Sequence, residues 1–297
     1  MRIERLGDIR TTLGEGPYWD TVDQRLFFVD IKGRRIWRFD PATADFRGWD
    51  TPVEPSAISR VAGGGLVAVL GDGFYAFDPD GGRFAPIAMV DTLNGAVQIN
   101  DAKVDRQGRF VGGGAAKSRE PIAPLYSFDG QTVTTIDVGF TICNGPCWSV
   151  DGGTFYIADT IPNKLYAYDY DAQTGVVANK RLLADCSDIG GFADGATVDA
   201  AGRIWMAFCG QGKIACFNPD GSIDRILHTE VQWVSSVQFG GPNLDRLYVT
   251  SFDPAAAVGR PPDDNSGYLY VIDGLGATGL AEPLGLSPSC SAIRPAS

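Results

Sequence analysis

A repeated order of residue types is the feature of this sequence that most restricts its possible folds. Three segments share it: NDAKVDRQGRFVGGG from Asn100, NGPCWSVDGGTFYIADT from Asn144 and DGATVDAAGRIWMAF from Asp194. Each has a polar residue, a small residue and a short apolar stretch, then an aspartate, a glycine-containing turn and another strand-like stretch. The segments start 44 and then 50 residues apart, close to the interval between successive blades of a β-propeller.

Weaker copies extend the repeat along the chain. They begin near Glu15, Ser56 and Val234, so the pattern occurs six times. We therefore predict an all-β fold, a six-bladed β-propeller with four-stranded antiparallel blades, as a single domain over residues 1–297. The segment RIERL near the N-terminus is available to complete the last blade and close the ring. A β-sandwich is the competing all-β fold, but it gives no reason for a repeat at this interval.

The repeats begin with polar residues that a propeller would bring together. The innermost strand of each blade lines the central channel, so equivalent first residues meet at one mouth. Two carboxylates and two amides converging there would bury charge, which a bound cation would compensate. The alternative is that each is only a turn residue, because Asn-Gly and Asp-Gly are common in turns. The positions are Glu15, Asn100, Asn144 and Asp194, with Ser56 and either Ser235 or Ser236 in the other two blades.

Charge and hydropathy exclude several kinds of partner. The 25 Lys and Arg residues against 36 Asp and Glu give a formal net charge of −11, and no basic cluster stands out. Nucleic acid and anionic membrane surfaces are therefore not expected as partners. The segment MRIERLGDIR is charged where a signal peptide needs an apolar core, and no apolar run has the roughly 18 residues of a membrane helix. We expect a cytoplasmic protein, and nothing in the sequence indicates its oligomeric state.

The cysteines and the single histidine narrow the chemistry further. His228 lies away from the strand starts and no G-x-S-x-G elbow accompanies it, so we interpret it as a surface or packing residue. We interpret the cysteines, which lack zinc-site spacing, as small buried residues in a reducing compartment. A disulfide or soft-metal pair of Cys143 and Cys147 is the alternative. The six cysteines are Cys143, Cys147, Cys186, Cys209, Cys216 and Cys290.

These motifs resemble those of the gluconolactonase family, which also contains regucalcin (senescence marker protein) and luciferin-regenerating enzyme. The matching segments span nearly the whole chain in the family's order. They are LGEGPYWD (13–20), IND with VDRQGRFVGG (99–113), NGPCWSVDGGTFYIADT (144–160), DGATVDAAGRIWMA (194–207) and FGGPNLDRLYVTSF (239–252). The resemblance implies a six-bladed propeller with one divalent metal near the channel mouth. For bacterial members it also implies an intramolecular ester of an aldonic acid as the substrate.

The resemblance also assigns roles to individual residues. The family's metal ligands fall on Glu15, Asn144 and Asp194, and an asparagine that contacts substrate, or reaches the metal through water, falls on Asn100. Many members carry an arginine two residues earlier, where this chain has Gln98, so a neutral amide would contact the substrate there.

One loop does not align clearly with the family. The segment KSREPIAP (117–124) overhangs the site in relatives, and here it contains Lys117, Arg119 and Glu120. These charged residues are either substrate contacts or part of a solvated loop.

We therefore predict a metal-dependent hydrolase that opens a sugar lactone, an aldonolactone, to the aldonic acid. The metal would polarise the carbonyl group, and Asp194 would act as general base toward the attacking water. Oxygen ligands leave one divalent ion of Ca²⁺, Zn²⁺, Mn²⁺, Mg²⁺ or Fe²⁺ admissible as the cofactor. The sequence does not separate one sugar or ring size from another.

Three alternatives share the architecture. A non-catalytic calcium-binding or interaction propeller would bind metal without turnover. A different metal-dependent hydrolase, phosphotriesterase-like and related to diisopropylfluorophosphatase or paraoxonase, would act on another ester, although a single histidine excludes a paraoxonase-like histidine mechanism. A strictosidine-synthase-like propeller would not be expected to carry Glu15, Asn144 and Asp194 together.

Overall fold

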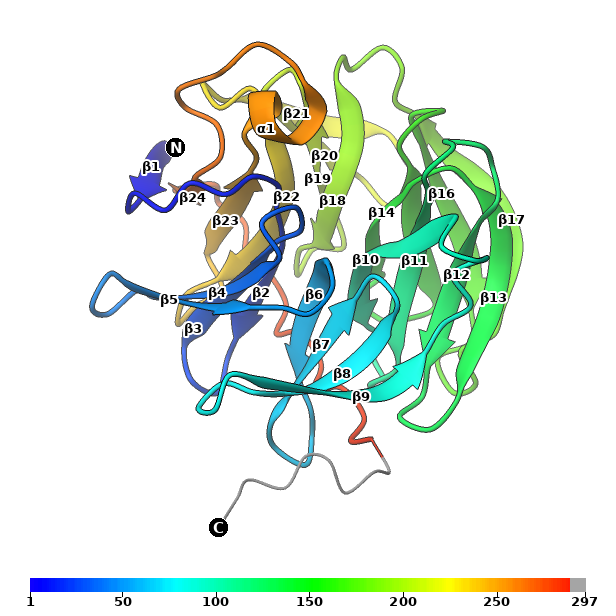
Figure 1. Ribbon diagram of the computed structural model, residues 1–297. Helices are drawn as coiled ribbons and strands as arrows, with labels where there is room; N and C mark the ends of the chain where they lie inside the picture. Colours follow the sequence, from blue (N-terminus) through cyan, green and yellow to red (C-terminus); the bar gives the residue numbers. More distant parts are fainter. Residues whose placement is uncertain (289–297) are drawn as a thin grey trace.

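Six four-stranded antiparallel sheets stand in a ring in the computed structural model, which describes residues 1–288 (Figure 1). The predicted six-bladed β-propeller with four-stranded antiparallel blades is therefore confirmed. One short helix, α1 (Pro254–Val258), follows the innermost hairpin of the last blade. Residues 289–297 of the predicted domain range, including Cys290, lie outside the described residues.

Each of the first five blades is built from four consecutive strands joined by hairpins. In the first two blades they are β2 (Gly14–Asp20), β3 (Arg25–Asp30), β4 (Arg35–Asp40), β5 (Asp45–Asp50), β6 (Pro55–Arg60), β7 (Leu66–Leu70), β8 (Gly73–Asp78) and β9 (Arg83–Met89). In the third and fourth they are β10 (Val97–Val104), β11 (Phe110–Ala116), β12 (Ala123–Phe128), β13 (Val133–Phe140), β14 (Cys143–Trp148), β15 (Thr154–Asp159), β16 (Lys164–Tyr170) and β17 (Val177–Asp185). In the fifth they are β18 (Phe192–Val198), β19 (Ile204–Cys209), β20 (Lys213–Phe217) and β21 (Ile223–His228).

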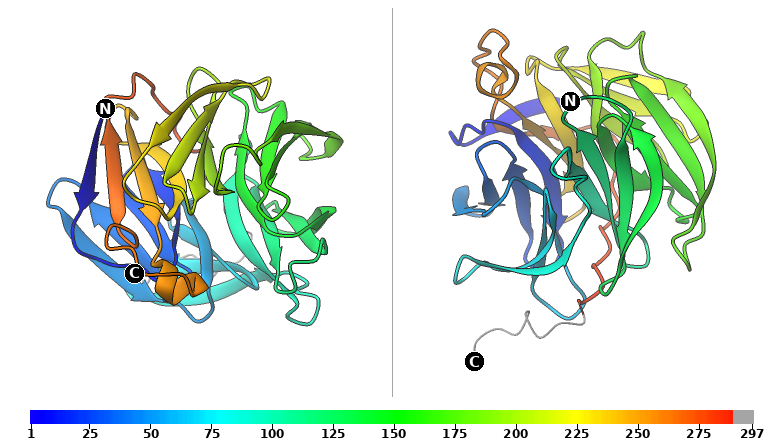
Figure 2. Two further views of the ribbon diagram at one scale, coloured as in Figure 1. Left: turned by 90° about the horizontal axis from the view of Figure 1, so that it is seen from above. Right: turned by 45° about the vertical axis from the view of Figure 1, so that its right-hand side comes forward.

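The last blade combines strands from distant parts of the chain. Its strands are β22 (Val234–Gly240), β23 (Arg246–Ser251), β24 (Leu269–Asp273) and β1 (Arg2–Leu6). The strand β1 pairs with β24 in antiparallel register, as the dark blue and orange strands of Figure 2 show. This confirms that RIERL completes the last blade. The innermost strand β22 then packs beside β2, which closes the ring.

The aspartate of the repeat forms the turn after the innermost strand. Asp105 Oδ1 accepts hydrogen bonds from the backbone N–H groups of Gln107 (2.8 Å) and Arg109 (2.9 Å). Asp199 Oδ1 accepts the equivalent bonds from Ala201 and Arg203, each over 2.9 Å. A carboxylate that binds the backbone two and four residues later stabilises a tight turn, which explains why the repeat carries an aspartate there.

All six innermost strands have a register shift where the sequence places a polar residue. A β-bulge of this kind bends the strand and changes the direction of a side chain, and bulges are common next to active sites. The shifts lie between Glu15 and Tyr18, Pro55 and Ala57, Ile99 and Asp101, Asn144 and Cys147, Ala193 and Ala196, and Val234 and Ser236.

The interpretation of the cysteines and of the histidine agrees with the structure. His228 is exposed at the end of β21. Cys143 and Cys147 are free, so they form no disulfide. The described cysteines, all buried and free, are Cys143, Cys147, Cys186, Cys209 and Cys216.

We expect Gly145→Ala to lower the free energy of unfolding by roughly 2–5 kcal/mol, as measured by urea denaturation. Gly145 has a φ of +60°, and an added Cβ would lie 2.7 Å from Ala196 Cβ and 2.9 Å from Ala196 N. Gly276 is the matched control, because it has a φ of +65° with no atom within 4 Å of an added Cβ. Equal losses in the two variants would show that the contact between β14 and β18 has no energetic importance.

Candidate functional site

The predicted metal ligands lie at the register shifts of three innermost strands. Glu15 is on β2, Asn144 on β14 and Asp194 on β18, and their exposed fractions are only 7%, 4% and 7%. Asn100 lies at the shift of β10, and its Nδ2 donates to Asn144 Oδ1 over 3.0 Å. Burial raises the pKa of Glu15, and the charge of the neighbouring Asp194 raises it further. The structure therefore brings these four residues, hereafter the oxygen cluster, together at one end of the channel.

The hydroxyl group of Thr160 determines how the amide of Asn144 is oriented. Thr160 Oγ1 donates its hydrogen to Ala193 O over 2.8 Å, so it accepts its bond from Asn144. Asn144 Nδ2 donates that bond, also over 2.8 Å, which leaves Oδ1 facing Asn100. Oδ1 accepts one hydrogen bond from Asn100 and retains a second lone pair. Asn144 therefore presents an amide oxygen, and not an amide nitrogen, to the cluster.

Burial and mutual repulsion both act on the carboxylates of the oxygen cluster. Burial raises the pKa of Glu15 well above its usual range, and the negative charges of Asp194 and Asp101 raise it further. The pKa of Asp194 is also raised, mainly by burial and to a smaller extent by the charge of Asp101. Ionising both groups is therefore costly unless positive charge is added beside them.

Asp101 is a third buried carboxylate, which the sequence analysis did not single out. It directly follows Asn100 on β10, and Asp101 Oδ2 accepts a hydrogen bond from Gly145 N over 2.8 Å. This bond ties β10 to β14 beside Asn144. Burial raises the pKa of Asp101 to about 6. The motif IND (99–101) could have identified Asp101, because the aspartate comes immediately after Asn100.

The serines at the two remaining strand starts join neighbouring blades. Ser56 Oγ donates to Ile99 O over 2.7 Å, which holds β6 against β10. Ser235 Oγ donates to Gly14 O, which holds β22 against β2. These hydroxyls are used in blade packing, so the candidate ligands come from the other four blades.

The predicted substrate contacts have different environments. Gln98 is partly buried on β10, two residues before Asn100. Arg119 and Glu120 are exposed in the connection between β11 and β12, as is Lys117. In residues 1–288, no hydrogen bond or ion pair joins these side chains to the oxygen cluster, so their role in substrate binding stays a prediction.

The donor set of the oxygen cluster fits a divalent cation. Two carboxylates and an amide oxygen fixed by Thr160 are hard oxygen donors, and burial raises the pKa values of Glu15 and Asp194, so a bound cation would favour their ionised forms. The part of the chain that the structure describes contains no group of three or more His, Cys, Asp or Glu side chains placed to hold a metal. A site here would therefore depend on the oxygen of Asn144 as its third protein donor.

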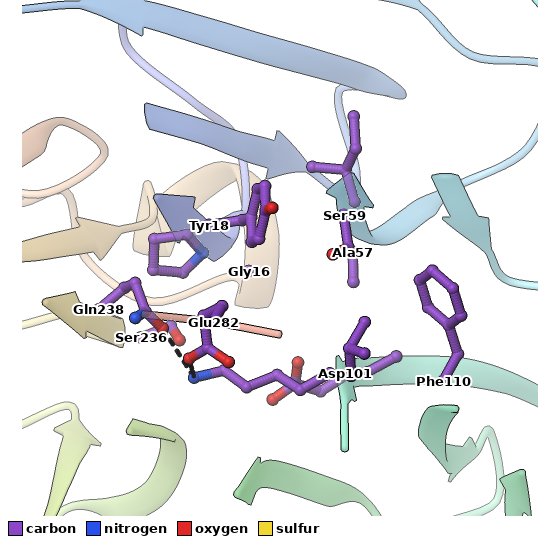
Figure 3. Close-up of a pocket in the computed structure, with 14 residues that line it drawn as sticks. Gly16, Tyr18, Ala57, Ser59, Asp101, Phe110, Ser236, Gln238 and Glu282 are labelled. Carbon is purple, nitrogen blue, oxygen red and sulfur yellow. Dashed lines mark hydrogen bonds and ion pairs between the residues drawn. The ribbon is translucent and has the colours of Figure 1, made fainter. Parts of the chain in front are cut away.

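A cavity lies in the channel next to the oxygen cluster (Figure 3). Its wall includes Gly16 and Asp101, which are neighbours of the cluster, together with Ser236 and Gln238 from the last blade. Glu15, Asn144 and Asp194 do not line it. The cavity is therefore behind the cluster, deeper in the channel.

A six-bladed propeller with buried oxygen donors at one end of its channel is the architecture that the resemblance implied. The chain belongs to the SMP-30/Gluconolactonase/LRE-like family, whose pattern it matches over residues 13–253. Among the described residues, no helix is long and apolar enough to cross a membrane.

Named relatives match almost the full length of the chain. A pentonolactonase of Haloferax volcanii is 35% identical over 291 residues, which cover 95% of this chain and 97% of the relative. The solved structure of a luciferin-regenerating enzyme superimposes with a TM-score of 0.88 at 27% identity, covering 96% of this chain and 99% of that one. A regucalcin of Agrobacterium tumefaciens, described as a calcium-binding protein, superimposes with a TM-score of 0.87 at 25% identity and covers 94% and 96%.

We expect the metal-free protein to lose stability as the pH rises from about 4, the unfolded carboxyl pKa, through the folded-state values of about 6 for Asp101 and about 8 for Asp194. Folding raises the pKa values of Asp101, to about 6, and of Glu15 and Asp194. A carboxyl with a raised folded-state pKa contributes stability below its unfolded pKa, and loses it as the pH rises through the folded-state pKa. Thermal unfolding in chelator across this range measures the effect. Glu15→Gln should make the melting temperature depend less on pH. A wild-type melting temperature that rises with pH in this range would contradict the raised pKa values of the buried carboxyl groups.

Proposed function

We propose that this protein is a metal-dependent hydrolase that opens a sugar lactone, an aldonolactone, to the aldonic acid. The observation that carries the proposal is the buried set of Glu15, Asn144 and Asp194, whose carboxylates need a positive charge beside them. The similarity to a pentonolactonase supports the reaction, and the similarity to a regucalcin described as calcium-binding supports a cation.

Three residues of the chain would hold the cation. When bound by Glu15, Asn144 and Asp194, it supplies Lewis-acid stabilisation of the negative charge that develops on the lactone carbonyl oxygen. Asp194 accepts a proton from the water that attacks the carbonyl carbon. It returns this proton to the ring oxygen as the carbon–oxygen bond of the ester breaks, so the products are a carboxylic acid and a hydroxyl group.

The hydrogen bonds of Asn100 define what it offers to a substrate. Both hydrogens of its Nδ2 are used, because the amide donates to Cys143 O and to Asn144 Oδ1, each over 3.0 Å. The amide oxygen of Asn100 is then its remaining polar group, and it accepts hydrogen bonds only. Asn100 therefore suits a hydroxyl group of a sugar, or a water molecule, better than a carbonyl oxygen. Gln98, on the same strand, contributes a second neutral amide.

We expect metal-restored hydrolysis of at least one aldonolactone. The protein is stripped with chelator, single metals are added back, and acid release is followed from 1,4- and 1,5-lactones of pentonic and hexonic acids against a protein-free, metal-matched blank. Glu15→Gln and Asp194→Asn should lower kcat/KM about 100-fold or more, because each removes a charged ligand or the base. Asp169→Asn, an exposed change on the third strand of its blade, should have no effect.

Two outcomes would contradict parts of this proposal. Full turnover by Asp194→Asn with metal bound would remove Asp194 as the general base. Tight metal binding without turnover of any lactone would instead support the calcium-binding propeller.

We also expect Thr160→Val to weaken metal binding about 10- to 100-fold, measured by isothermal titration calorimetry. The substitution keeps the shape of the side chain but removes the acceptor that orients Asn144. The amide can then rotate and present its nitrogen to the cation. Thr135→Val, an exposed change on β13, is the matched control. Equal metal affinities in the two variants would show that Thr160 does not set this orientation.

A further inference from the structure

The segment that follows β24 crosses the end of the channel opposite to the oxygen cluster. We refer to residues 278–287 as the C-terminal strap. In Figure 1 it runs behind the centre of the ring, in red. Backbone hydrogen bonds join the strap to the far ends of the innermost strands, or to the turns that follow them, in four blades. The strap therefore spans the channel. These bonds are Ala200 N to Thr278 O, Gly279 N to Leu244 O, Gly285 N to Arg60 O and Leu286 N to Gly108 O.

A glutamate in the middle of the strap reaches into the channel. Glu282 lines the cavity behind the oxygen cluster, and its carboxylate lies 3.6 Å from Lys103 Nζ. The exposed fractions of the two side chains are only 13% for Lys103 and 15% for Glu282. An ion pair with so little exposure is screened less than one at the surface, and losing either partner would leave the other charge partly buried and unpaired.

Lys103 connects strands that are not neighbours in the ring. Its Nζ donates to Ala196 O on β18 over 2.8 Å and to Gln238 Oε1 on β22 over 2.9 Å. Figure 3 shows Gln238 and Glu282 beside one another in this cavity. Lys103 itself lies on β10, so its ammonium group bridges the channel from the third blade to the fifth and sixth.

The two strands that Lys103 joins carry residues of the oxygen cluster. On β10, Asn100 is three residues before Lys103, and on β18, Asp194 is two residues before Ala196. Both cluster residues lie at the register shifts of their strands, where the β-ladder itself is interrupted. The hydrogen bond from Lys103 to Ala196 joins the two strands just beyond these interruptions. It therefore limits how far β10 and β18 can move apart.

We propose that Lys103 is a positioning residue: held in the channel by Glu282 of the C-terminal strap, it sets the spacing between β10 and β18, and with it the placement of Asn100 relative to Asp194. The proposal rests on the function proposed above. A misplacement of catalytic or ligand groups by about 1 Å can lower a rate about 100-fold, and the link from Lys103 to Ala196 joins the two strands three residues after Asn100 and two residues after Asp194.

The test compares Lys103→Met, Glu282→Gln and Arg181→Met. Lys103→Met keeps an unbranched apolar side chain but removes the charged ammonium group, and Glu282→Gln removes the charge that holds Lys103. Arg181→Met is the matched control, because Arg181 pairs with Asp169 on the outside of the fourth blade, where both are largely exposed. Each full-length protein is measured for kcat, KM, the dissociation constant of Mn²⁺ in the absence of lactone, and melting temperature.

We expect Lys103→Met to lower kcat about 10- to 100-fold with a smaller change in KM, and to weaken Mn²⁺ binding about tenfold. Glu282→Gln should act in the same direction with a smaller effect, and Arg181→Met should change neither quantity. A folded Lys103→Met protein with wild-type kcat and Mn²⁺ affinity, and only a lower melting temperature, would overturn the proposal.

Two further outcomes remain decisive. If Lys103→Met does not fold, Glu282→Gln takes its place, and wild-type values of kcat and Mn²⁺ affinity in that variant would overturn the proposal. If the wild-type protein binds Mn²⁺ but opens no lactone, the proposed lactonase reaction is wrong. The proposal about Lys103 is then still decided by comparing the Mn²⁺ affinities of the variants.

Discussion

The pairing of β1 with β24 is the contact on which the rest of the structure depends. It extends from Arg2 opposite Asp273 to Leu6 opposite Leu269, and it completes the blade that fills the gap between the fifth blade and the first. The two carboxylates of the oxygen cluster come from the first and fifth blades, on either side of that last blade. They face each other only in a closed ring, so the candidate site is a product of ring closure and not of any single blade.

Within the ring, four of the six innermost strands have two conflicting tasks. Each must pair with its neighbour along a ladder, and each must also place a polar side chain of the oxygen cluster at the end of the channel, whereas the serines of β6 and β22 bond to neighbouring blades. The register shift resolves the conflict, because it interrupts pairing for a residue or two and changes the direction of the side chain. In β14 the shift requires a positive φ at Gly145, directly after Asn144. The glycines of the EGP and NGP motifs are therefore as much a part of the site as the polar residues that precede them.

The repeat in the sequence was enough to predict the fold, because six similar segments at blade-like spacing have few other solutions. It also predicted which strand positions would converge, and the hydrogen bond between Asn100 and Asn144 joins two of them. The contacts deeper in the channel could not be predicted in this way. Lys103 bonds to residues 93 and 135 positions away, and Glu282 lies outside the repeat, so no local pattern connects them. The loop 117–124 likewise has no repeat to place it.

The C-terminal strap changes the way in which such a molecule can come apart. An open array of similar units held together only by contacts between neighbours can fray from either end, one unit at a time. Here the strap binds turns in the second, third, fifth and sixth blades, so the separation of one blade breaks contacts in several others. We therefore expect unfolding to be concerted around the ring. In that case the oxygen cluster would keep its arrangement until the whole molecule melts, although its residues are drawn from four separate blades.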